Sequence, residues 1–96
     1  MPSFEFHCAD SIKLFGAEFP EVHKWLDELA GTPEYGMRHR KKRHHAAGIQ
    51  EAVKLFGPEA GPVARRHIVL DLHQEGWTDK DRFPRNETDY VKMGLF

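Results

Sequence analysis

The chain has 96 residues, 40% of them hydrophobic and 30% charged, with a net charge of −1 at pH 7. This length and composition fit one globular domain, and no apolar run reaches the roughly 18 residues that a membrane helix needs. Because the chain has one cysteine and no signal-peptide pattern, we expect a cytoplasmic protein without an internal disulfide or a cysteine-based zinc site.

Helix start and stop signals recur along the chain. Asp10 is a predicted cap, Pro20 and Pro62 occupy predicted first helical positions, and Gly16 and Gly76 mark predicted ends. The predicted helices span residues 11–15, 20–30, 33–56 and 62–76, with a last turn around Phe83. We therefore predict an all-α fold, a compact bundle of four to five helices that forms a single domain over residues 1–84.

The tail, residues 85–96, carries several apolar side chains close to the C-terminus. Eight Lys/Arg against two Glu give residues 38–70 a balance of +6, so the remaining residues carry −7. Apolar termini and opposite charges on one chain favour self-association, and we predict a homo-oligomer, a dimer in the first instance, with the tail near the interface. The alternative is a tail that folds back over its own helices.

The predicted helix 33–56 changes character along its length. Its second half has an apolar face around Ile49, and the same face becomes cationic in the first half. Buried charge needs partners, so this change indicates a polar pocket; the alternative is a solvated basic face, and Gly48 indicates a kink or close packing. The first half places Tyr35, Arg38, Lys42 and His45 on that face, His39 on its flank, and Arg40, Arg43 and His44 on the opposite side.

Seven histidines and two i, i+4 pairs suggest a metal site. His23 and Asp27 are four residues apart in one predicted helix, and His67 and Asp71 are four apart in another. Each pair has the spacing for shared metal ligation or for a histidine–carboxylate hydrogen bond, and each is also compatible with a simple surface pair. The predicted metal ligands are His23, Asp27, His39, His45, His67 and Asp71, which suit zinc, manganese or iron.

A pattern of basic and histidine residues occupies the centre of the chain. It consists of Arg38-His39-Arg40, Arg43-His44-His45, Gly48-Ile49 and Phe56-Gly57, flanked by His7, Phe15-Gly16, Pro20, His23-x-Trp25-x-Asp27, His67 and Asp71. This pattern resembles a small uncharacterised family of bacterial and phage proteins over residues 7–77. The resemblance implies a bacterial or phage origin and assigns no reaction; Lys41-Lys42 makes the spacer more basic than the pattern, and the tail after Phe83 lies outside it.

These residues together predict a site for a phosphate-bearing ligand, a nucleotide in the first instance, beside a divalent metal ion. The predicted phosphate- and base-binding residues are Arg38, Arg40, Lys42, Arg43, Arg66 and Tyr35, with His44 and His45 as proton shuttles if the site is hydrolytic. The analogy is to helical metal-dependent phosphohydrolases, although the adjacent His-Asp doublet of that class is missing. The alternatives are a non-catalytic nucleotide or cyclic-nucleotide sponge, a nucleic-acid-binding module that uses the basic stretch RHRKKRHH, and a structural domain.

Overall fold

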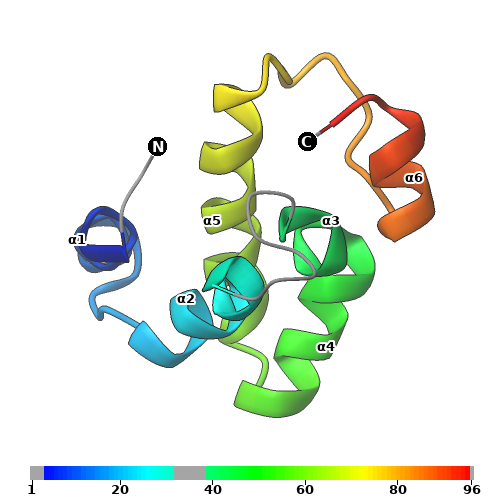
Figure 1. Ribbon diagram of the computed structural model, residues 1–96. Helices are drawn as coiled ribbons and strands as arrows, with labels where there is room; N and C mark the ends of the chain where they lie inside the picture. The colour runs from blue at the N-terminus through cyan, green and yellow to red at the C-terminus, as the bar shows by residue number, and fades with distance from the viewer. Residues whose placement is uncertain (1–3, 32–38, 96) are drawn as a thin grey trace.

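The computed structural model describes residues 4–31 and 39–95, and within them it consists of helices without strands (Figure 1). This confirms the predicted all-α class. The helices are α1 (Phe4–Phe15), α2 (Pro20–Leu26), the 3-10 helix η1 (Glu28–Gly31), α3 (Arg40–Arg43), α4 (Ala46–Phe56), α5 (Ala60–Gln74) and α6 (Glu87–Lys92). No helix among these residues is long and apolar enough to cross a membrane.

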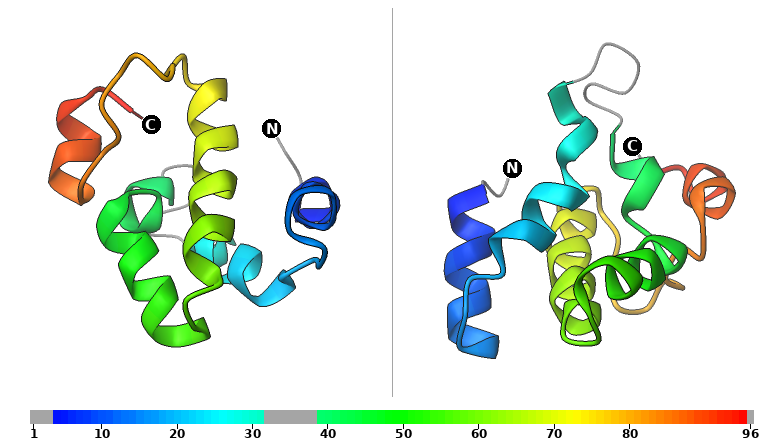
Figure 2. Two further views of the ribbon diagram at one scale, coloured as in Figure 1. Left: turned by 180° about the vertical axis from the view of Figure 1, so that it is seen from behind. Right: turned by 90° about the horizontal axis from the view of Figure 1, so that it is seen from below.

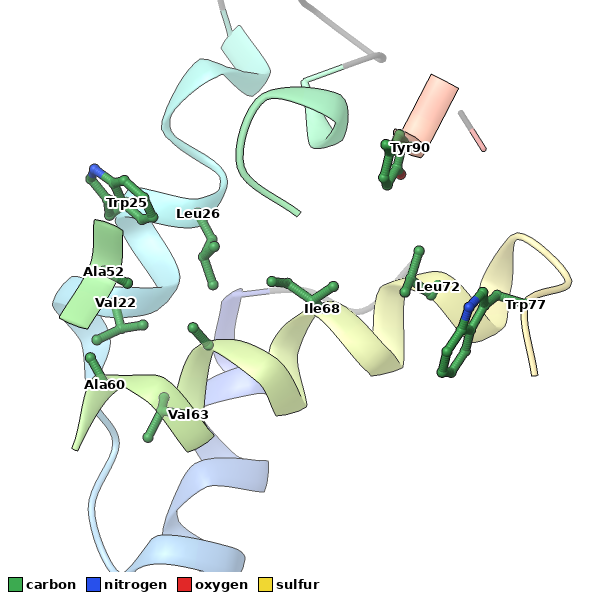
Figure 3. Close-up of a cluster of buried hydrophobic side chains, with 11 residues drawn as sticks. Val22, Trp25, Leu26, Ala52, Ala60, Val63, Ile68, Leu72, Trp77 and Tyr90 are labelled. Carbon is green, nitrogen blue, oxygen red and sulfur yellow. The ribbon is translucent and has the colours of Figure 1, made fainter. Parts of the chain in front are cut away.

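Helix α5 forms the centre of the molecule. It packs against α4 and α2 and contacts α1, so that α1 and α2 lie on one side of it and α3, α4 and α6 on the other (Figures 1 and 2). Along α5, Val63, Ile68 and Leu72 are at most 1% exposed and form the core with Val22 of α2 and Ala52 of α4 (Figure 3). Two of the polar residues described below, His67 and Asp71, lie on the same central helix, so core packing fixes their positions.

The first two helices differ in length from their predictions. Helix α1 extends over Phe4–Phe15 instead of 11–15, and Asp10 lies inside it, where its carboxylate pairs with Arg66 rather than capping a helix start. Gly16 follows with a φ of +81°, a conformation that glycine adopts without strain, as its predicted role as a stop requires. Helix α2 begins at Pro20 as predicted but ends at Leu26, because the chain tightens into η1.

The predicted single helix over 33–56 is wrong in its described part, because the chain breaks at His44 and His45 between α3 and α4. His45 has an extended backbone, and its Nδ1 accepts a hydrogen bond from the Gly48 amide at 3.1 Å, which caps α4. A Cβ added to Gly48 would lie 2.6 Å from the carbonyl carbon of Arg43 and closer still to its oxygen. The predicted close packing at Gly48 is therefore confirmed, and this glycine allows the tight corner.

The tail folds back onto its own chain. Asn86 caps α6 by accepting a hydrogen bond from the Asp89 amide at 2.9 Å, and α6 packs against α3. The Tyr90 side chain is 0% exposed and lies near Leu72 in the core (Figure 3). The structure thus has the arrangement that the sequence left as the alternative, while the dimer remains a prediction. No helix forms around Phe83, and the chain from Trp77 to α6 is irregular.

Candidate metal centre

A cluster of buried polar side chains fills the space between α1, α2, α3 and α5. Six of its members are at most 4% exposed; Asp27 is the exception, with 34% of its side chain exposed. We call these residues the histidine–aspartate cluster: His7 from α1, His23 and Asp27 from α2 and its end, His39 and His44 at the two ends of α3, and His67 and Asp71 from α5. Seven polar side chains in so little solvent require partners, and the geometry shows how they meet.

The Asp71 carboxylate contacts three histidines. Its Oδ2 lies 2.9 Å from His44 Nε2 and 3.3 Å from His67 Nε2, and its Oδ1 lies 3.3 Å from His7 Nε2. The i, i+4 spacing of His67 and Asp71 on α5 brings these two side chains together, as the sequence predicts. His44 and His7 come from α3 and α1 and reach the same carboxylate through tertiary packing.

The Asp27 carboxylate faces the same group from the other side. Its Oδ2 lies 3.3 Å from His67 Nε2, while its Oδ1 lies 3.0 Å from His39 Nε2 and 3.6 Å from His44 Nε2. The two carboxylates therefore converge on His67 with one oxygen each. Four imidazole Nε2 atoms surround two carboxylates within the cluster.

Several of these close atoms make no hydrogen bond, which points to metal ligation. His7 Nε2, His67 Nε2 and Asp71 Oδ1 are buried and have no hydrogen-bond partner, although each has an opposite atom at 3.3 Å. Two donors bound to one ion at about 2.0–2.2 Å lie roughly 3.0–3.5 Å apart. One donor atom each from His7, Asp27, His67 and Asp71 lies within 4.8 Å of the others, so these residues fit a metal centre.

The electrostatics of the cluster favour a cation at its centre. Burial lowers the pKa of His23 and of His44 to about 4, so both rings are neutral at pH 7. Burial disfavours a charged His67, but the carboxylates beside its Nε2 outweigh that effect and raise its pKa. The histidines around Asp27 and Asp71 hold the pKa of both carboxyls well below their usual range against the effect of burial. Neutral imidazoles and ionised carboxylates are the forms that bind metals.

A second layer of side chains supports the cluster. His67 Nδ1 lies 2.9 Å from His23 Nδ1, and His23 Nε2 lies 2.7 Å from the hydroxyl of Ser11 on α1. If His67 binds through Nε2, its Nδ1 carries the proton and donates to His23, which then donates through Nε2 to Ser11. This arrangement gives the predicted ligand His23 a supporting position behind His67.

On the opposite side, Arg40 connects the cluster to the tail. Its Nη2 lies 3.5 Å from Asp71 Oδ1, and its Nη1 donates to Glu75 Oε2 at 3.0 Å. Tyr90 of α6 donates its hydroxyl hydrogen to the same Glu75 oxygen at 2.9 Å. Arg40 was predicted to point away from the polar face, but the break after α3 turns it inward, where it is 5% exposed.

A family comparison bears on the residues that form this cluster. Residues 3–92 match the family described as a domain of unknown function, DUF6915. The chain belongs to this family. The predicted resemblance to an uncharacterised family is confirmed at that level, and the match extends past residues 7–77 into the tail that was expected to lie outside it. Neither the curated proteins nor the solved structures gave a match.

Within this DUF6915 domain, His45 lies outside the cluster. Its Nδ1 accepts from the Gly48 amide and its Nε2 donates to the Lys41 carbonyl at 3.1 Å, so both ring nitrogens serve the corner between α3 and α4. The prediction of His45 as a metal ligand and proton shuttle therefore does not fit this DUF6915 domain. His44, the other predicted shuttle, enters the cluster through Nε2 instead.

The predicted phosphate-binding cations have carboxylate partners in the structure. Arg43 pairs with Glu28, Lys42 with Glu87, and Arg66 with Asp10. Arg38 and Tyr35 lie outside the described residues, so their predicted roles have no structural counterpart here. Sequence reasoning missed His7 as a principal member of the cluster. Its signal was present in the motif, where His7 is one of the flanking residues ahead of Phe15-Gly16.

Proposed function

We propose that the histidine–aspartate cluster of this DUF6915 domain binds a divalent transition metal, namely zinc, manganese or iron, and that the protein uses it to hydrolyse a phosphate-bearing substrate of the nucleotide class. The observation that carries the metal site is the set of buried, close, non-hydrogen-bonded atoms on His7, His67 and Asp71. Imidazole and carboxylate together form the donor set that these metals share in proteins.

The exposure of Asp27 supports access to such a centre. Asp27 is 34% exposed, whereas His67 and Asp71 behind it are at most 2% exposed, so water reaches the cluster from the Asp27 side. A catalytic metal keeps a coordination position for water or substrate, and a bound ion makes that water a stronger nucleophile near neutral pH. In the hydrolysis, the water oxygen bonds to phosphorus, the bond to the leaving oxygen breaks, and that oxygen takes up a proton.

The surroundings of Arg43 support a phosphate contact at this residue. Its guanidinium lies 4.3 Å from the Trp25 ring and pairs with Glu28, whose side chain is 60% exposed. The Nη1 atom that pairs with Glu28 also donates to the Trp25 carbonyl at 2.6 Å, which holds the guanidinium in place. The exposed ion pair with Glu28 contributes about 0–1 kcal/mol, so a substrate phosphate can replace Glu28 at little cost. The predicted role of Arg43 in ligand binding therefore stays part of the proposal.

The experiment has a metal step and a substrate step. Purified protein is analysed for metals, stripped with a chelator, and melted with added Zn²⁺, Mn²⁺ or Fe²⁺. We expect at least one ion per chain and a rise in Tm, because a ligand at about 1,000 times its Kd stabilises the native state by about 4 kcal/mol. Metal below one-tenth of stoichiometry together with an unchanged Tm for every ion would refute the metal site.

The loaded protein is then incubated with a panel of nucleotides and the products are separated by chromatography. Conversion that depends on the metal supports hydrolysis. Recovery of the intact nucleotide from the protein refutes hydrolysis and favours the sponge. A His73→Asn variant is the control for the loss of a histidine outside the cluster, because 46% of the His73 side chain is exposed to solvent.

A further inference from the structure

We infer that the histidine–aspartate cluster holds two metal ions side by side, bridged by the carboxylate of Asp71. The inference rests on the proposed metal centre and adds the number of ions in it. It also assigns a metal-binding role to His7, which the sequence-based ligand set left out.

The stacking of His7 on His67 is the first observation. The two rings lie 3.7 Å apart between centroids with an angle of 17° between their planes, so they are nearly parallel. Both Nε2 atoms face the same carboxylate: His7 lies 3.3 Å from Asp71 Oδ1 and His67 3.3 Å from Asp71 Oδ2. Lone pairs on parallel stacked rings do not converge on one point. They direct two ions to neighbouring positions, at the spacing of about 3.5–4 Å known from two-metal sites.

The number of donor atoms is the second observation. The Nε2 atoms of His7, His39, His44 and His67 and the four oxygens of the two aspartates make up eight donor atoms, and each of the four nitrogens lies within 3.3 Å of a carboxylate oxygen. Structural zinc takes four ligands and octahedral ions take six, so the cluster offers more donors than one ion uses. A carboxylate whose two oxygens face different histidines has the geometry of a bridge, and Asp71 has this geometry.

The two positions differ in their ligands. The ligands of the first ion are His44 Nε2, His67 Nε2, Asp71 Oδ2 and Asp27 Oδ2. Asp71 Oδ2 lies 2.9 Å from His44 Nε2 and 3.3 Å from His67 Nε2, and Asp27 Oδ2 lies 3.3 Å from His67 Nε2. The second ion has His7 Nε2 and Asp71 Oδ1, which are both buried and without a hydrogen bond, and an Asp27 oxygen within 4.8 Å of the histidine. With fewer protein ligands, the second ion binds more weakly and leaves more positions for water and a phosphate oxygen.

The charge of a two-ion centre also fits an anionic substrate. Asp27 and Asp71 supply two negative charges, and the Arg40–Glu75 pair beside them is neutral in sum. Two divalent ions therefore leave an excess of positive charge in a buried site, and a hydroxide and a phosphate group are the ligands that neutralise it.

Mn²⁺ is the probe for the test, because two Mn²⁺ ions that share a carboxylate show a spin-coupled electron paramagnetic resonance spectrum. The stripped full-length chain is titrated with Mn²⁺, and the bound ions per chain and the spectrum are recorded. We expect one tight and one weaker ion, and the coupled signal as the second position fills. In His7→Asn we expect one ion per chain and the spectrum of an isolated Mn²⁺, with His73→Asn retaining two ions.

The outcomes separate the two proposals. Saturation of the wild-type chain at one ion, with an uncoupled spectrum, overturns the second ion and leaves the proposed metal centre intact. No bound ion overturns both. A His7→Asn variant that keeps two coupled ions overturns the assignment of His7, and circular dichroism shows whether the variant is folded. If the variant is unfolded, the number of bound Mn²⁺ ions and the spin-coupled spectrum of the wild-type chain decide whether a second ion binds.

Discussion

Replacing Gly48 by alanine tests the corner that brings His44 into the cluster. An alanine in a helix is ordinarily about 1 kcal/mol more favourable than a glycine, so a general rule predicts that Gly48→Ala stabilises α4. The structure predicts the opposite. The added Cβ would lie 2.6 Å from the carbonyl carbon of Arg43 and closer to its oxygen, and both are backbone atoms that cannot rotate away.

The size of the effect follows from the two ways in which the corner can respond. Over-packing of a rigid site costs about 1–3 kcal/mol. If the corner opens instead, the hydrogen bond from the Gly48 amide to His45 is lost, which costs about 1 kcal/mol for a helix cap. The two alternatives together span a loss of about 1–3 kcal/mol. For a domain of this size, 1 kcal/mol corresponds to about 4–8 °C, so Tm falls by about 4–24 °C.

The assay is thermal unfolding followed by circular dichroism, with Gly61→Ala as the matched control. Gly61 is also helical, but a Cβ there would lie 3.3 Å from Cγ2 of Val53, a side-chain methyl that can shift. We expect the Tm of this control to remain within a few degrees of the wild type. A Gly48→Ala protein that melts at or above the control would refute the close approach at the corner and the positioning of His44 derived from it.

Three more predictions concern the surroundings of the site. His45→Ala should lower stability by about 0.5–2 kcal/mol as a lost helix cap yet keep the metal stoichiometry, whereas His44→Ala should lose metal, which elemental analysis of both variants measures. Tyr90→Phe should cost about 1–2 kcal/mol in denaturant unfolding, because the buried hydroxyl donates to a carboxylate. The Arg82 side chain and the Arg85 amide hold the pKa of Asp89 at about 2, so its ionised form stabilises the fold above about pH 4. The Tm difference between wild type and Asp89→Asn should therefore shrink as pH falls from 4 to 2, and a constant difference contradicts this linkage.

Much of the site was predictable from local spacing. His67 and Asp71 on α5 meet because residues four apart in a helix share a face, and His23 reaches the same group from α2. The His67–Asp71 pair depends on one helix alone, so the sequence specifies it without knowledge of the tertiary structure, whereas the contact of His23 with His67 joins two helices. Helix ends at Gly16 and Gly76 were also predictable from local sequence, since each has a positive φ that glycine favours.

The arrangement around α3 was not predictable from periodicity. The projection over 33–56 assumed one continuous helix, in which His44 and Arg40 point away from the core and His45 points toward it. The break at His44–His45 reverses these positions: His44 and Arg40 become buried against Asp71, and His45 caps α4. The signals for the break are local, a histidine able to cap and a glycine three residues later. Either reading of Gly48 was open until the approach of the Arg43 carbonyl was known.

The charges around the cluster also determine how a nucleotide would bind. Arg40 is paired with Glu75, and Arg66 is paired with Asp10. Because a carboxylate already neutralises each guanidinium, neither attracts a phosphate with a full positive charge. The proposed ions are then the main source of positive charge for the substrate. We therefore expect equilibrium dialysis to show nucleotide binding by the metal-loaded chain and at least a tenfold weaker affinity after chelation. Equal affinity with and without metal would mean that the basic side chains suffice, and it would favour a metal-independent sponge over the hydrolase.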